Sequence, residues 1–144
     1  MLKKIYRDRL EKVADHLKYG KLGHKIFDFS VINENVEGTW PKGNTCGTNG
    51  CAIGELPIIF PKYFKFEHDQ VIKIGTEQDF WDFYTWFGLN PDIYTMLFHP
   101  GEYRIWNKKV LLHNASRKQV AQSIREFLEW DRLGYYEAWL ALNG

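Results

Sequence analysis

The chain is poor in cysteine and has no long apolar run. Two of its 144 residues are cysteine, too few for a disulfide framework. No apolar run approaches the roughly 20 residues that span a bilayer. Residues 1–13, MLKKIYRDRLEKV, contain no apolar core of a signal peptide. We therefore expect a cytoplasmic protein with reduced thiols and no membrane segment.

The chain also lacks an excess of charge of either sign. Its 19 lysine and arginine residues face 18 acidic residues, for a net charge of +1. Such a chain has no global field to attract nucleic acid, so nucleic acid is an unlikely partner. Basic residues cluster only at the start, interrupted by acidic ones, and we interpret this cluster as a solvated helix face. Its members are Lys3, Lys4, Arg7 and Arg9.

Aromatic residues, in contrast, are abundant. Phenylalanine, tryptophan and tyrosine make up 17% of the sequence. Each large ring buries much area, so rings can stabilise the core of a chain of this length. The length suits one domain, and we predict a single globular domain over residues 1–144.

Apolar periodicity predicts two long helices. Tyr6, Leu10, Val13 and Leu17 form one stripe of a helix over residues 2–19, which Gly20 ends. Near the other end, Ser116 and Gln119 form a capping box ahead of a second helix. Its apolar positions are Val120, Ile124, Phe127 and Leu128.

Shorter elements are predicted between and after these helices. A helix capped by Thr48 is expected through about Leu56, where Pro57 should break it. Further helices are expected from Thr76 to Gly88, after Asn90–Pro91 and after Gly134. Residues 65–75 look like a short strand or a hairpin, and residues 102–113 look like a β-hairpin. The sum is a mainly helical α+β fold, a single compact domain of about five helices with one or two small β-hairpins.

The stretch CGTNGC, residues 46–51, carries both cysteines. Structural zinc sites usually show two close ligand pairs, and here Cys46 and Cys51 could form only one. The other candidate ligands are scattered: His24, His68, His99 and His113. We therefore expect no metal and no cofactor.

Cys51 has two interpretations. A thiol in the first turn of a helix has a lowered pKa and could act as a nucleophile with a histidine base. His113, followed by Asn114, is the candidate base, and His68 or His99 could also serve. Alternatively, Cys51 is a small buried hydrophobic residue.

The glycines of this stretch also allow two interpretations. Gly47, Thr48, Asn49 and Gly50 could form a turn whose backbone N–H groups converge on one anion. The glycines could instead serve only an abrupt reversal and close packing.

Three residues beyond this stretch bear on the same site. Trp40 or Trp86 could stack on a ligand bound at the turn, although burial would explain Trp86 equally well. Glu55 stands in the apolar run AIGELPII, and an unpaired charge is costly to bury there. It therefore either faces water or pairs with an arginine or histidine in a pocket.

The motif CGTNGCAIGELPIIFP resembles a group of small bacterial and phage proteins that have no assigned activity. Their softer common features match Arg9–Leu17, Phe27–Phe29, Trp86–Leu89 and Leu97–Pro100. The resemblance implies an intracellular domain found in mobile or phage genomes, and it implies no reaction.

We predict a small non-enzymatic accessory protein, of the phage or mobile-element type, that binds a partner protein or a small anionic or nucleotide ligand. The ligand-binding residues would be Gly47–Gly50 with Trp40 or Trp86. The alternative is a cysteine-dependent hydrolase or transferase that uses Cys51 and His113.

Overall fold

The structure is a computed structural model that describes residues 1–21, 26–27, 34–35, 48–50, 52–67, 70–75, 83–98 and 116–143. Its elements are α1 (Lys4–Tyr19), β1 (Ile26–Phe27), β2 (Glu34–Asn35), β3 (Thr48–Gly50), η1 (Ile53–Glu55, a 3-10 helix), α2 (Leu56–Ile59), β4 (Phe64–Glu67), β5 (Gln70–Lys73), α3 (Phe83–Trp86), α4 (Pro91–Phe98), α5 (Arg117–Arg132) and α6 (Tyr135–Asn143). This confirms the mainly helical α+β fold. None of the helices in the described residues is long and apolar enough to cross a membrane.

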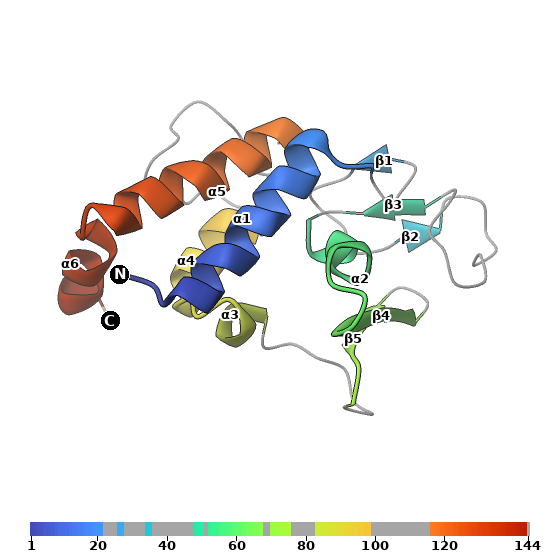
Figure 1. Ribbon diagram of the computed structural model, residues 1–144, viewed down its shortest axis with the longest axis horizontal. Coiled ribbons are helices and arrows are strands. Elements are labelled where there is room, and N and C mark those ends of the chain that lie inside the picture. The colour runs from blue at the N-terminus through green and yellow to red at the C-terminus, as the bar shows by residue number, and fades with distance from the viewer. Residues whose placement is uncertain are drawn as a thin grey trace.

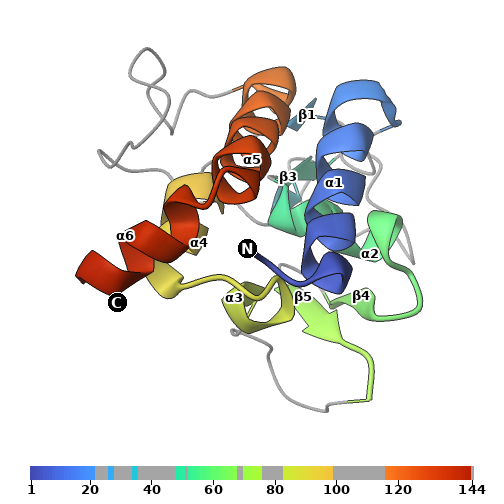
Figure 2. The same cartoon turned by 60° about the vertical axis from the view of Figure 1, so that its left-hand side comes forward.

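The two long helices pack against each other. Figures 1 and 2 show α1 beside α5, with α2 on the opposite flank of α1. The predicted stripe of α1 is buried at Leu10, Val13 and Leu17, and Tyr6 is half-buried. The predicted stripe of α5 is buried as well. The capping box forms: the Gln119 N–H donates to Ser116 Oγ at 3.2 Å, and the Ser116 N–H donates to Gln119 Oε1 at 2.9 Å.

The strands form two small sheets. β3 is the central strand of the first, parallel to β1 and antiparallel to β2, with Asn49 opposite both Ile26 and Glu34. The second is the antiparallel hairpin β4–β5, in which Phe64 faces Lys73. It confirms the hairpin predicted in residues 65–75. The predicted hairpin over residues 102–113 and the start of the helix at Thr76 lie outside the described residues.

The prediction for Thr48 to Leu56 was wrong. Thr48 belongs to β3 and caps no helix, and the helical turns begin only at Ile53. Pro57 lies inside α2 and does not end it. A proline in the first turn of a helix sacrifices no hydrogen bond, because the N–H there has no partner within the helix.

A cluster of aromatic rings surrounds Trp86. Its ring packs edge-on against Phe60, at a centroid distance of 4.7 Å, and against Phe64, at 4.9 Å. Gly88 follows α3 with a positive φ of 65°, and a Cβ there would lie 2.3 Å from the Tyr6 ring. Glycine is therefore required both by the backbone conformation and by the closeness of α1.

The basic cluster at the start of the chain is only partly solvated, which corrects the interpretation as a solvated face. Lys3 and Lys4 are exposed. Arg9 instead lies over the Trp86 ring, 4.0 Å from its centroid, and donates to the Trp86 carbonyl at 2.7 Å. Arg7 points to α5. Long cationic side chains can pack their stems and planar heads against rings while part of the group stays solvated.

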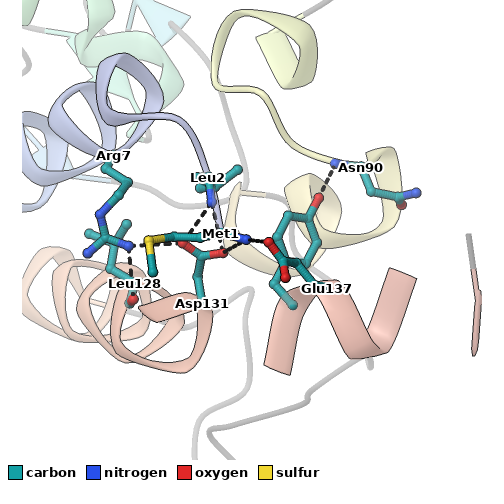
Figure 3. Close-up of polar contacts among 8 residues, drawn as sticks. Met1, Leu2, Arg7, Asn90, Leu128, Asp131 and Glu137 are labelled. Carbon is teal, nitrogen blue, oxygen red and sulfur yellow. Dashed lines mark hydrogen bonds and ion pairs between the residues drawn. The ribbon is translucent and has the colours of Figure 1, made fainter. Parts of the chain in front are cut away.

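Arg7 and the backbone of Leu2 meet at a buried carboxylate of α5, Asp131 (Figure 3). The Leu2 N–H lies 3.0 Å from both Asp131 oxygens, and Arg7 Nη1 donates to Oδ2 at 2.9 Å. Asp131 has no exposed side-chain area, whereas Arg7 is 20% exposed. A buried carboxylate is tolerated only when donors surround it, so this group ties the start of α1 to α5.

Replacing Asp131 by asparagine should destabilise the protein strongly. The change keeps the shape but leaves Arg7 without its counter-charge, and breaking a buried pair costs about 3 kcal/mol or more. Urea unfolding should show a much lower midpoint for Asp131→Asn. The matched control is Glu129→Gln, which removes a surface ion pair with Arg132 on the same helix and should leave the midpoint unchanged. Equal midpoints in the two variants would contradict a structural role for Asp131.

Tyr136 should make the stability fall at alkaline pH. Burial raises the pKa of its hydroxyl, the Asp131 charge adds to this, and the Asn90 N–H, which donates to it at 2.8 Å, opposes it. An unfolded tyrosine loses its proton near pH 10, so above about pH 10 the unfolded chain binds fewer protons than the folded one, and stability decreases. This contribution is complete below pH 10 and is lost as the pH rises.

Comparison with Tyr136→Phe isolates the effect. At pH 7 the variant should be about 1 kcal/mol less stable, because the Asn90 N–H loses its acceptor. Above pH 10 that difference should shrink in urea titrations. Tyr135→Phe, which removes an exposed hydroxyl, should match the wild type at pH 7. A constant difference across the alkaline range would refute the assignment.

Candidate functional site

The site predicted at residues 46–51 is only partly described. Thr48, Asn49 and Gly50 form β3, whereas Gly47 lies outside the described residues, as do Trp40 and the alternative catalytic pair Cys51 and His113. The thiol hypothesis therefore stays a prediction.

The described part of this stretch does not form the turn that an anion cradle needs. β3 is extended and pairs on both sides, with β1 and with β2. Successive N–H groups of a strand point in opposite directions and bond to its neighbours, so they do not converge on one ligand. Trp86, the proposed stacking wall, is a core residue with 6% of its surface exposed. It fills the aromatic cluster, which is the burial alternative that the sequence left open for this residue.

The structure instead shows an open cleft between the last turns of α1 and α2. Its volume is about 520 Å³, within the range of small-molecule sites. One wall is polar and comes from α1, and the other is apolar and comes from α2. The lining residues are Lys12, Asp15, His16, Tyr19, Gly20, Ile58 and Ile59. We call this surface the α1–α2 cleft.

At the cleft, His16 is held by a buried carboxylate. Glu55, at the end of η1, has no exposed side-chain area, and its Oε1 lies 2.8 Å from His16 Nε2. His16 itself is 14% exposed. An ionised carboxylate only accepts hydrogen bonds, so it places a proton on Nε2 and fixes the orientation of the ring. Of the two alternatives for Glu55, the structure therefore shows pairing with a histidine.

Gly20 leaves space beside the other ring nitrogen of His16. A Cβ at position 20 would lie 2.6 Å from Nδ1. Any larger residue would therefore force the imidazole or the backbone beside it to shift. Among the described residues, Nδ1 has no hydrogen-bond partner. It is therefore the nitrogen of His16 that is left for a ligand.

The charges around the cleft are unequally compensated. Asp15 is paired with Arg125 of α5, so its charge is balanced. Lys12 makes no ion pair with any described residue and lies over the Phe60 ring, 5.1 Å from its centroid. An exposed ammonium group in this position attracts anions.

Arg117 offsets the partial negative charge at the C-terminal end of α1, which would otherwise repel an anion. Its Nε donates to the Leu17 carbonyl at 2.6 Å, and its Nη2 donates to the carbonyls of His16, at 3.2 Å, and Gly20. Unpaired carbonyls at the end of a helix carry partial negative charge. The guanidinium satisfies the carbonyls of Leu17 and Gly20 next to the cleft, and it adds a second donor to the His16 carbonyl, which already accepts from the Gly20 N–H at 2.8 Å.

The described residues offer binding chemistry more clearly than metal chemistry. They contain no group of three or more histidine, cysteine or acidic side chains able to hold a metal ion. The cleft combines one cation, one oriented imidazole and an apolar wall. This combination suits a small molecule with a polar end and an apolar body.

The sequence pattern missed His16 as a candidate, although two signals point to it. Glu55 in an apolar run requires a cationic or donor partner if it is buried. His16 flanks the apolar stripe of α1, three residues after Val13 and next to Leu17, so it faces a boundary between core and solvent. Connecting the two signals requires knowing that α2 packs beside the end of α1.

The tautomer of His16 tests the geometry of the pair. When the imidazole is neutral, its proton should lie on Nε2, because Glu55 accepts it. Long-range proton–nitrogen correlation spectra of protein with labelled histidine should show this tautomer, with the signal assigned by its loss in His16→Gln. A proton on Nδ1 would show that the carboxyl group, and not the imidazole, carries the shared proton.

Comparison with known proteins adds no assignment. No protein-family model, no curated protein and no solved structure matches the chain. The resemblance carried by the CGTNGC motif stays a prediction, and a functional proposal has to come from the geometry of the α1–α2 cleft.

Proposed function

We propose that the protein binds a small ligand in the α1–α2 cleft. The observation that carries this proposal is the placement of His16, which is held by the fully buried Glu55 at the edge of a cleft of about 520 Å³. Burying a carboxylate is costly, and a ring oriented in this way offers one nitrogen to a ligand.

The apolar wall supports a ligand with a hydrophobic part. Ile58 is 41% exposed at the cleft, and Tyr19 is 74% exposed on the opposite wall. A flat organic body between these side chains would remove apolar area from water, at roughly 25 cal/mol per Å². This proposal keeps the small-ligand function predicted from the sequence and moves its site from residues 47–50 to the α1–α2 cleft.

Chemical-shift mapping tests the proposal. Phenol, benzamide and benzoate serve as probes that share a ring and differ in their polar group. Amide shifts should change at residues 12–20 and 56–59 for at least one probe, because these segments line the cleft.

Two matched variants provide the control. Ile58→Trp places a large ring across the mouth and should abolish the shifts. Ile74→Trp introduces the same ring at a comparably exposed isoleucine outside the cleft and should leave them unchanged. Shifts that survive Ile58→Trp, or that map to other segments for every probe, would reject the cleft as the binding site.

A further inference from the structure

We infer that the ligand of the α1–α2 cleft is a small organic anion, a carboxylate or phosphate on an apolar body, and that it binds best when His16 is protonated. This inference rests on the proposed binding function and adds the chemical class of the ligand. It depends on three features of the cleft: the unpaired cation, the second imidazole nitrogen and the capped end of α1.

The first feature is the charge of Lys12. Asp15 is already matched by Arg125, so Lys12 is the uncompensated charge among the residues that line the cleft. Its position over the Phe60 ring keeps the ammonium near the apolar wall. An anionic end group would pair with this ammonium while the body of the ligand packs on Ile58 and Ile59.

The second feature is His16. The protonated imidazole donates two hydrogen bonds in opposite directions, one to Glu55 and one from Nδ1. The negative charge of Glu55 then balances the imidazolium, and Nδ1–H remains for an acceptor on the ligand. The neutral ring donates only to Glu55 and presents a lone pair at Nδ1, which repels an anion.

The third feature is the capped end of α1, together with the charges around it. Glu55 of η1 pairs with His16, and Lys12, Asp15 and Tyr19 of α1 line the same cleft. From α5, Arg117 donates to the His16 carbonyl and Arg125 pairs with Asp15. Asp15 and Glu55 each have a basic partner, and Arg117 covers the carbonyls at the end of α1. Among these described groups three cations face two carboxylates while the imidazole is neutral, and protonation of His16 adds one further positive charge, which favours an anion.

Benzoate and benzamide give the decisive comparison, because they differ almost only in charge. Nitrogen–proton titrations followed at residues 12–20 should give a dissociation constant for benzoate several-fold lower than for benzamide at pH 6. Benzoate stays ionised above about pH 6, so a change of its affinity above that pH reports on the protein and not on the probe. The benzoate constant should therefore rise when His16 loses its proton, which the histidine ring signals report in the same pH series, and the benzamide constant should not change.

Variants separate the contributions of the two groups. Lys12→Gln should weaken benzoate roughly two- to fivefold and leave benzamide unchanged, whereas Lys65→Gln, at an exposed lysine of β4, should alter neither. His16→Gln retains a donor for Glu55 and should abolish the pH dependence of benzoate binding. If His16→Gln does not fold, the wild-type pH series and Lys12→Gln still decide the question.

The outcomes distinguish this inference from the proposed function. Benzamide binding in the cleft as well as benzoate, with no pH dependence, would overturn the inference and leave the binding site standing. A failure of all probes to shift residues 12–20 and 56–59 would overturn both.

Discussion

The structure depends on the attachment of α1 to α5 at both of its ends. At the start of α1, Asp131 accepts from the Leu2 N–H and from Arg7; at its end, Arg117 donates to three carbonyls. We call these two groups of hydrogen bonds clamps. Between them the apolar faces of α1 and α5 pack together, and Leu10 is fully buried there. Each clamp joins residues about a hundred or more positions apart, so the helix pair is fixed in register as well as in distance. The opposite flank of α1 is then free to face α2 and form the cleft.

The two fully buried carboxylates Asp131 and Glu55 have different roles. Asp131 receives backbone and guanidinium donors, and its partners Arg7 and Leu2 are ordered parts of the α1–α5 contact. Glu55 receives a histidine that lines an open cleft. A guanidinium stays charged, whereas an imidazole can be neutral or cationic. The charge of the pair at Asp131 is therefore fixed, while the charge of the pair at Glu55 depends on whether His16 carries one proton or two.

Local patterns predicted the elements that depend on local physics. The apolar stripes of α1 and α5, the capping box at Ser116 and the restart of helix at Pro91 all have their signals within a few residues. The strand at Thr48–Gly50 was missed because its stability comes from pairing with β1 and β2, partners 13 to 23 residues away, and not from its own propensity.

The candidate site could be predicted only in part for the same reason. The sequence shows that Glu55 needs a basic partner if it is buried. It contains several arginines and histidines, and nothing in the sequence indicates which of them pairs with Glu55. The choice of His16 is made by tertiary packing, since the turn formed by η1 and α2 rests against the end of α1. The roles of Arg7 and Arg117 were equally hidden, because each binds a segment more than 95 residues away in the chain.

Gly20 connects the fold to the site by its size. Its φ of −79° is open to any residue, so its backbone conformation does not require glycine. What requires glycine is the space beside His16, where a Cβ would lie 2.6 Å from Nδ1 and 2.8 Å from the His16 carbonyl. The same residue supplies a carbonyl to Arg117. A side chain at position 20 would therefore disturb the clamp at the end of α1 and the imidazole at once. Gly20 therefore contributes both to the attachment of α1 to α5 and to the access of a ligand to Nδ1 of His16 in the cleft.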